Sequence, residues 1–208
     1  MSAVLYDYWR SSASYRVRIA LNLLGIAFEC VPVNLLQGEQ RSDAHLARNP
    51  QGLVPVLDID GQRLTQSLAI IEYLHETRSS STLIPSDPLG RARVRALSHA
   101  IAMDIHPVGN AHVLGDVAAI TGGGDAAKQD WSRKYIGEGL AAFEAMLGES
   151  PFCHGHTPGM ADCCLVPQVY NARRWGIDLS AMPKLAGIAA RCEALPAFEN
   201  AAPRQPAN

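Results

Sequence analysis

Apolar residues along the chain change from strand-like to helix-like spacing and back again. The segments 3–8 (AVLYDY) and 27–33 (AFECVPV) have the composition of short strands. Between them, apolar residues recur at helical spacing from Val17 to Leu24, and Gly25 predicts the end of that helix. We therefore expect two parallel strands joined by a helical crossover.

A hairpin and a second long helix are predicted next. The segment 40–48 has the pattern of a short, weaker helix. Asp60-Gly61 lies between the strand-like stretches LVPVLDID and QRLTQ, which is a strong hairpin signal. Residues 67–77 have helical periodicity, and Ser67 is placed as the N-cap. The order β-α-β, short α, β-β-α is the layout of a thioredoxin-like domain.

The rest of the chain has a different character. Residues 78–90 are rich in serine and proline and are expected to form a linker. Every periodic segment after the linker is helical. These segments are 91–117, 126–147, 160–175 and 183–195. The prediction is an α/β thioredoxin-like domain over residues 1–80, followed by an all-α domain over residues 88–208.

Composition excludes several function classes. The chain has 208 residues, of which 48% are hydrophobic and 18% charged, as in an ordinary globular protein. A net charge of −2 gives no electrostatic basis for binding nucleic acid or an acidic membrane. No basic leader with a long apolar stretch and no membrane-length apolar run is seen, so we expect a cytoplasmic protein.

The cysteines do not predict disulfides or a metal centre. Their odd number and irregular spacing favour reduced thiols. Cys163 and Cys164 are adjacent and lack the Cys-x-x-Cys spacing of zinc and redox sites. The stretch CHGH at 153–156 lies between two prolines and is interpreted as a solvated loop rather than a ligand cluster. We expect no metal.

The turn after the first strand carries the first candidate chemistry. It holds Arg10, Ser11, Ser12 and Ser14 just before and within the start of the helix, where amides are unpaired and the helix dipole is positive. It contains no cysteine, because Ala13 lies among the serines, so a thiol reaction of the protein itself is excluded there. Such a turn is suited to stabilising a thiolate that another molecule brings.

Two further features indicate what that molecule is. Pro55 at the start of a strand is tolerated at an edge or in a special turn, often after a cis bond. If that bond is cis, the main-chain groups of Val54 point outward and can pair with a peptide. Gln66 and Ser67 at a helix start suit a carboxylate. Together these features describe a site for a small thiol peptide, although a capping serine and a Val-Pro turn are each common structural features.

Four stretches in this chain resemble the zeta class of glutathione transferases, the maleylacetoacetate and maleylpyruvate isomerases. They are RSSASYRVRIALNLLG, NPQGLVPVLDIDG, LTQSLAIIEYL and ADCCLVPQVYNARRWGIDLS. The resemblance runs over nearly the whole chain in the same order and spacing. It implies the glutathione transferase fold, glutathione as cofactor, a small dicarboxylate substrate, usually a homodimer, and cis–trans isomerisation in aromatic catabolism.

The resemblance also implies roles for individual residues. The glutathione sulfur would meet Ser11 and Ser12. The remainder of the tripeptide would contact Gln40, Val54, Gln66, Ser67, His106 and Asn110. Arg10 and Arg174 would face the carboxylates of the second substrate.

Several of these residues also have structural explanations. His106 before a proline is often a hydrogen-bonded core residue. Arg10 and Arg174 could be solvated or ion-paired, and Arg16 and Arg18 are interpreted as structural or interfacial.

Two positions depart from the family pattern. Ala13 replaces the usual cysteine, which argues against dehalogenation but not against isomerisation, because isomerisation needs no protein thiol. Gly159 replaces the usual Ser or Thr cap before the helix that carries Asp162. We interpret Asp162 as a structural residue.

Two classes of function therefore stay open. The first is the isomerase, acting on maleylacetoacetate or maleylpyruvate. The choice of substrate is open because no arginine follows His106 in HPVGNAHVL, where His112 could substitute. The alternative is a general transferase that conjugates electrophiles, or a non-catalytic protein that binds glutathione or another ligand.

Overall fold

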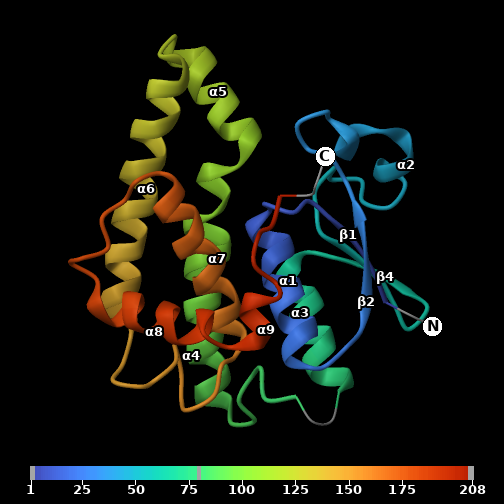
Figure 1. Cartoon of the computed structure of the whole chain (residues 1–208), viewed down its shortest axis with the longest axis vertical. Helices are drawn as coiled ribbons and strands as arrows, with labels where there is room; N and C mark the ends of the chain where they lie inside the picture. The colour runs from blue at the N-terminus through green and yellow to red at the C-terminus, as the bar shows by residue number, and fades with distance from the viewer. Residues whose placement is uncertain (1–2, 79–80, 206–208) are drawn as a thin grey trace. The chain divides into compact units, whose positions relative to one another are not determined.

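The computed structural model describes residues 3–78 and 81–205. Met1 and Ser2, two serines of the predicted linker (79 and 80) and residues 206–208 lie outside the described residues. The chain divides into two compact units (Figure 1). The first comprises Met1–Ile84 and Leu195–Asn208, and the second comprises Pro85–Ala194. We describe each unit by itself.

The first unit contains a four-stranded sheet and its helices. Its elements are β1 (Ala3–Asp7), α1 (Ser12–Leu23), β2 (Phe28–Pro32), η1 (Glu39–Arg41), α2 (Asp43–Leu46), β3 (Val56–Ile59), β4 (Gln62–Thr65), α3 (Ser67–Thr77) and α9 (Pro196–Glu199). The strand order is β2-β1-β3-β4, with β1 and β2 parallel and the other pairs antiparallel. This confirms the predicted crossover followed by a hairpin.

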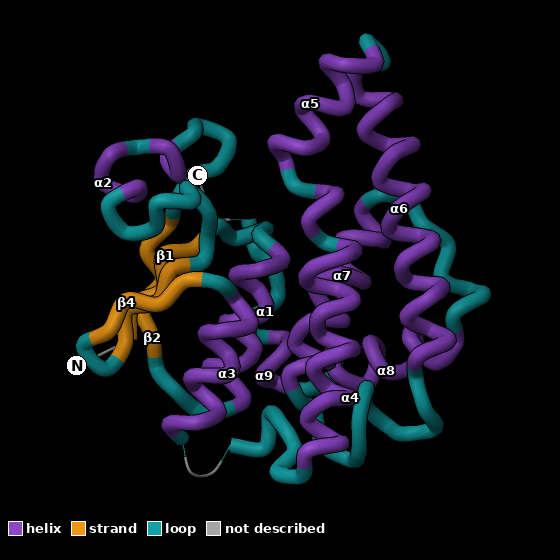
Figure 2. The backbone as a smooth tube through the Cα atoms, turned by 180° about the vertical axis from the view of Figure 1, so that it is seen from behind, coloured by secondary structure: helices purple, strands orange, loops and turns teal. Residues whose placement is uncertain are grey.

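Local chemistry explains the hairpin and the core. Asp60 (φ 53°) and Gly61 (φ 74°) both adopt positive φ, as a two-residue turn of the I′ type requires. Helices α1 and α3 lie side by side on one face of the sheet (Figure 2). Leu5, Leu57 and Ile70 are fully buried between these layers. Apolar burial at this interface is the main source of the unit's stability.

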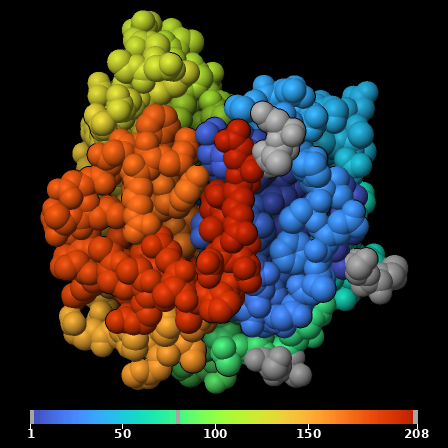
Figure 3. Space-filling model, viewed as in Figure 1, coloured from blue at the N-terminus to red at the C-terminus, as the bar shows by residue number. Residues whose placement is uncertain are grey.

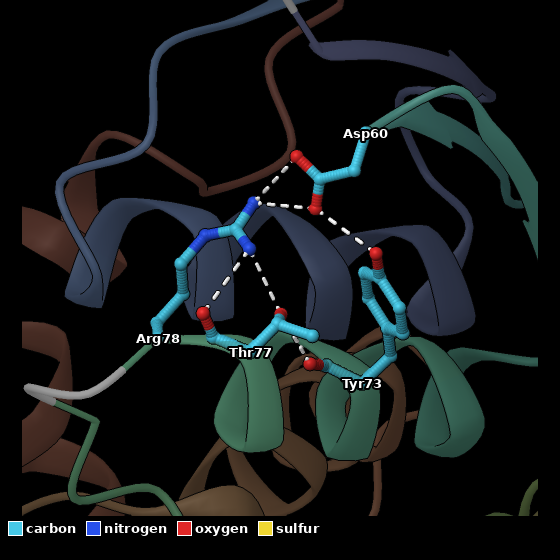
Figure 4. Close-up of polar contacts among 4 residues, drawn as sticks. All are labelled: Asp60, Tyr73, Thr77 and Arg78. Atoms are coloured by element: carbon cyan, nitrogen blue, oxygen red, sulfur yellow. Dashed lines mark hydrogen bonds and ion pairs between the residues drawn. The ribbon is translucent and has the colours of Figure 1, made fainter.

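A polar cluster joins the hairpin turn to the end of α3 (Figure 4). Arg78 donates to both carboxylate oxygens of Asp60, at 3.1 and 2.9 Å, and the Tyr73 hydroxyl donates to Asp60 Oδ2 at 3.0 Å. Thr77 accepts from Arg78 Nη1 at 2.8 Å. Because these groups are exposed or half-buried, we assign the cluster a modest stabilising role.

Two details of the first unit differ from the sequence-based expectation. The predicted helix 40–48 is two short pieces, because Ser42 has extended backbone (ψ 149°) and its hydroxyl caps α2 by accepting from His45 N. The prediction that Ser67 is the N-cap of its helix is wrong. The N-cap is Gln66, at φ 67° and without a side-chain capping bond, because β4 turns directly into the helix and makes Ser67 its first residue.

The C-terminal segment packs on α1, within the first unit (Figures 1 and 3). Three side chains of α1 donate to its carbonyls: Tyr15 to Phe198 O at 3.4 Å, Asn22 to Ala197 O at 2.9 Å and Arg18 to Ala201 O at 2.9 Å. The compact units therefore differ at the C-terminus from the predicted helical domain 88–208. Residues 195–205 carry one short helix, α9, which packs on α1.

All regular elements among the described residues of the second unit are helices, joined by loops. Its elements are α4 (Pro88–His99), η2 (Ala100–Ile105, a π-helix), η3 (Pro107–Gly109), α5 (Ala111–Thr121), α6 (Gly124–Met146), α7 (Met160–Arg174) and α8 (Pro183–Glu193). Helix α4 packs on α7, α5 on α6, and α7 on α8. The core includes Leu97, Ile136 and Phe143, all fully buried.

The predicted helix 91–117 is interrupted in the middle. The amide of His106 donates to Ile101 O at 2.8 Å, which is the i to i−5 pattern of a π-turn. Pro107 follows and has no amide proton to continue the helix, so a short 3₁₀ turn leads into α5. No helix in the described part of the chain is long and apolar enough to cross a membrane.

Candidate active site

The turn between β1 and α1 has the expected strand–turn–helix geometry. Ser11 is the N-cap of α1: its Oγ accepts from Ser14 N at 3.2 Å and its amide donates to Tyr8 O at 2.8 Å. Ser12 and Ala13 are the first two residues of the helix, and Ser12 is only 9% exposed. The turn thus presents hydroxyls at the positive end of a helix, an arrangement that stabilises an anion.

Arg10 lies at the edge of the same turn. Its side chain is half-buried, and the guanidinium carbon is 5.4 Å from the centroid of the Trp9 ring. A guanidinium stacked on an aromatic face keeps its charge and its N–H donors. Arg10 is therefore suited to binding a carboxylate near the start of α1.

The loop before β3 is fixed by two buried polar side chains that sequence reasoning did not single out. The Val54–Pro55 bond is cis, and Val54 lies outside the strand ladder, which begins at Val56. His45 Nε2 and Asn49 Nδ2 lie 3.0 and 2.9 Å from the carbonyl oxygen of Leu53. Because a carbonyl only accepts, His45 Nε2 carries the proton. These two contacts fix the main chain directly before Val54.

Gln40 and Gln66 are brought to this same loop. Gly52 has φ 63°, and a Cβ placed there would lie 3.0 Å from Gln40 O and 2.8 Å from Arg41 Nη1. Gln66 Nε2 donates to Gln51 Oε1 at 2.8 Å. The structure therefore brings Gln40, the 51–54 loop and Gln66 close together, and the glutathione-binding roles that the resemblance implies for Gln40, Val54 and Gln66 stay predictions.

Ser67 connects the start of α3 to α1. Its side chain is buried, and its Oγ accepts from Arg16 Nη1 at 3.2 Å. Arg16 is itself only 2% exposed. The predicted Arg18 role as a structural residue is confirmed, since it bonds Asp7, Trp9 O and Ala201 O. Arg16, in contrast, donates to Ser67, which is a candidate binding residue.

The other predicted residues belong to the second unit. His106 is half-buried and ends the π-turn, and Asn110 is the N-cap of α5 without a side-chain capping bond. Arg173 and Arg174 differ in their surroundings. Arg173 forms an ion pair with Glu193 of α8 at 2.6 Å. Arg174 is exposed, donates to Asn171 Oδ1 at 3.1 Å and lies 5.9 Å from the Trp175 ring.

Asp162 is a structural residue, as predicted. It is 1% exposed and accepts from the amides of Cys153 and Gly159, both at 2.9 Å. Burial raises its pKa, and the two amide bonds counteract that rise. Because Gly159 has no side-chain oxygen, Asp162 alone supplies the cap of α7.

The thiols have the properties of unreactive residues. Cys153, Cys163, Cys164 and Cys192 are buried and reduced, and burial raises the pKa of Cys153 and Cys163 well above the usual range. Cys30 is exposed, and partial burial of its thiol together with the nearby Asp7 carboxylate raises its pKa. Among the described residues, no group of three or more His, Cys, Asp or Glu side chains could hold a metal ion.

The chain matches known proteins over almost its full length. The N-terminal domain model of glutathione S-transferases matches residues 1–76, and the C-terminal domain model matches residues 113–200. A maleylacetoacetate isomerase from Rhizobium meliloti is 64% identical over 96% of this chain and 95% of its own length. A maleylpyruvate isomerase from Ralstonia sp is 45% identical over 96% of both chains.

Solved structures agree with this assignment. The holo structure of a maleyl pyruvate isomerase, described as a bacterial zeta-class glutathione S-transferase, has a TM-score of 0.93 at 44% identity and covers 96% of each chain. A maleylacetoacetate isomerase from Anaeromyxobacter dehalogenans with bound glutathione in its active site has a TM-score of 0.88 at 45% identity, covering 99% of this chain and 97% of its own. The predicted fold class is confirmed, and the chain belongs to the zeta class of the glutathione S-transferase family.

Proposed function

We propose that this protein is a glutathione-dependent cis–trans isomerase of a maleyl-type enedione acid, either maleylacetoacetate or maleylpyruvate. The observation that carries the proposal is the start of α1, where Ser11 and Ser12 offer hydroxyls at a positive helix end in a turn that has no thiol. The named activities of relatives that are 64% and 45% identical over 96% of the chain support it.

The donor set at this turn fits a sulfur anion. Ser11 Oγ already accepts from Ser14 N, so its own O–H is free to donate to a ligand. Ser12 adds a second hydroxyl at the helix start. Each unit by which these donors lower a thiol pKa from about 8.5 corresponds to about 1.4 kcal/mol of preference for the thiolate. Two hydroxyls and a helix end are sufficient for one to two units.

The remaining residues would hold the tripeptide. Val54 would pair through its main chain, Gln40 and Gln66 would contact polar groups, and Ser67 would bind a carboxylate at the start of α3. The resemblance implies that His106 and Asn110 also contact glutathione. When bound, glutathione supplies the thiolate that adds to the activated alkene and is then expelled, so the former double bond can rotate between the two steps.

Arg10 and Arg174 would bind the substrate. A guanidinium holds a carboxylate by two parallel hydrogen bonds and stays charged at every relevant pH. Positive charge beside the adduct also favours the enolate that forms when the alkene carbon is attacked. We therefore expect changes at these arginines to raise the substrate KM and to leave glutathione affinity unchanged.

The resemblance further suggests a cytoplasmic homodimer, and sedimentation of the purified protein would test the dimer. The domain ranges 1–80 and 88–208 likewise stay predictions.

The activity test follows the ultraviolet absorbance of maleylacetoacetate and of maleylpyruvate, with and without glutathione. We expect glutathione-dependent decay for at least one substrate, with no loss of free thiol after many turnovers, and the ratio of kcat/KM values would identify the preferred substrate. Stoichiometric consumption of thiol would instead indicate conjugation. Glutathione binding without decay of either compound would indicate a non-catalytic binding protein.

A matched pair of variants makes the test specific to the serine turn. Ser12→Ala removes a hydroxyl that does not cap α1, so turnover should fall at least about tenfold with little change in stability. Ser11→Ala removes the cap as well and should also destabilise the fold by about 1 kcal/mol. Unchanged turnover in both variants would contradict the roles given to these serines.

A further inference from the structure

A buried guanidinium lies at the start of α3, where the candidate site has its carboxylate-binding end. Arg16 comes from α1 and is 2% exposed, and Ser67 is 6% exposed. Arg16 Nη1 donates to Ser67 Oγ at 3.2 Å. The two helices that begin at the candidate site are therefore joined by a side-chain hydrogen bond away from solvent.

The direction of this bond fixes what Ser67 can offer. An arginine has N–H donors and no acceptor, so the oxygen of Ser67 must accept. The Ser67 hydroxyl hydrogen is then available only to another acceptor, such as a carboxylate oxygen. Without Arg16 the hydroxyl would rotate freely, and part of its population would point away from a ligand.

The start of α3 has no side-chain cap from its N-cap residue. The N-cap residue, Gln66, makes no side-chain capping bond, and its amide group donates to Gln51 instead. The first amides of the helix therefore receive no cap from Gln66, and they carry the partial positive charge of the helix end. Arg16 adds a full positive charge beside Ser67, the first residue of this helix.

The neighbouring buried arginine shows that this arrangement is specific. Arg18 is one helical half-turn away and also buried, but its partners are Asp7, Trp9 O and Ala201 O. Those contacts hold β1 and the C-terminal segment on α1. Arg18 is therefore a structural cation on the same helix and provides a matched control.

We propose that Arg16 is a positioning residue for glutathione: it orients the Ser67 hydroxyl and strengthens the start of α3 as a site for one of the carboxylates of glutathione. The inference rests on the proposed function. It adds a residue whose side chain acts through Ser67.

A double-mutant cycle tests the inference. Glutathione affinity is measured by titration calorimetry for the unchanged protein, Arg16→Met, Ser67→Ala and the double variant. We expect each single variant to bind glutathione about tenfold more weakly than the unchanged protein. The double variant should bind glutathione about as weakly as the weaker of the two single variants. The glutathione KM should rise by a similar factor, and kcat at saturating glutathione should stay within about threefold.

A second ligand separates positioning from a general structural effect. Glutathione diethyl ester has no free carboxylate, so Arg16→Met should change its affinity by less than about twofold. Arg16→Lys keeps a charged donor and should bind glutathione within about threefold of the unchanged protein. Arg18→Lys should show no coupling to Ser67→Ala, since it does not contact Ser67.

The outcomes distinguish this inference from the proposed function. Additive losses in the cycle, or an equal loss for glutathione and its diester, would overturn the role of Arg16 and leave the proposed function intact. If the unchanged protein does not bind glutathione, both are overturned. If Arg16→Met does not fold, the cycle is run with Arg16→Gln, which removes the charge and whose loss of glutathione affinity must disappear when Ser67 is alanine.

Discussion

Ala13 occupies the position at which the family resemblance implies a cysteine. It is the second residue of α1 and half-buried, directly after Ser12 in the serine turn. A helix start lowers the pKa of a thiol because the thiolate is stabilised there. Ala13→Cys should therefore create a thiol with a pKa of about 7, below the value near 8.5 of a free cysteine. The measurement is the rate of iodoacetamide alkylation against pH, followed site by site by mass spectrometry.

Cys30 provides the internal reference for that experiment. Partial burial and the Asp7 carboxylate raise its pKa, so at neutral pH it holds less thiolate than a free cysteine. Its alkylation should therefore require a higher pH than that of a free cysteine. If the thiol introduced at position 13 followed the same pH profile as Cys30, the turn would not stabilise a thiolate, and the role given to it would lose its physical basis.

At the scale of elements, the loop before β3 depends on a glycine. Gly52 has φ 63°, and an added Cβ would lie 2.8 Å from Arg41 Nη1 and 3.0 Å from Gln40 O. Gly52→Ala should destabilise the protein by about 1–2 kcal/mol through its left-handed backbone alone. Because the new methyl group would also displace Gln40, we expect the glutathione KM to rise about tenfold. Chemical denaturation and glutathione-dependent kinetics measure the two effects.

Gly61→Ala separates these two effects. Gly61 has φ 74°, and nothing lies within 4 Å of the position of its Cβ. The Gly61→Ala variant should lose about as much stability as Gly52→Ala, and its glutathione KM should stay within about twofold of the unchanged protein. An equal rise of KM in both variants would mean that general loosening, and not the displaced Gln40, weakens binding.

Sequence patterns predicted the elements where local chemistry determines them. The strand–turn–helix around Ser11 and the hairpin at Asp60-Gly61 follow from residues within a few positions, and the structure confirms them. The start of α3 was misjudged at Ser67 because serine is a common cap. Here β4 runs directly into the helix, and the N-cap position falls on Gln66 at positive φ.

Contacts between distant segments could not be predicted in this way. Arg16 reaches Ser67 across 51 positions, and His45 and Asn49 meet at the carbonyl of Leu53 only because the loop folds back. Neither periodicity nor spacing contains such information. The residues that hold the candidate site in place are therefore mostly those that the sequence left unassigned.

At the scale of the whole molecule, the C-terminal segment completes the core of the first unit. Phe198 is fully buried there, and its carbonyl accepts from Tyr15 of α1. Phe198→Ala should lower the free energy of unfolding by about 3–5 kcal/mol. Because the cavity would lie beside α1, amide hydrogen exchange should accelerate in α1 and leave α6 and α7 largely protected.

Phe143→Ala is the matched control, since Phe143 is equally buried but lies in α6 of the second unit. This variant should also lower the free energy of unfolding by about 3–5 kcal/mol. Amide hydrogen exchange should accelerate in α6 before it does in α1. Phe198→Ala should also weaken glutathione binding, because α1 carries Ser11, Ser12 and Arg16. Early exchange in α7 and an unaffected α1 after Phe198→Ala would instead place the C-terminal segment in the helical core. The domain range 88–208 stays a prediction that this measurement tests.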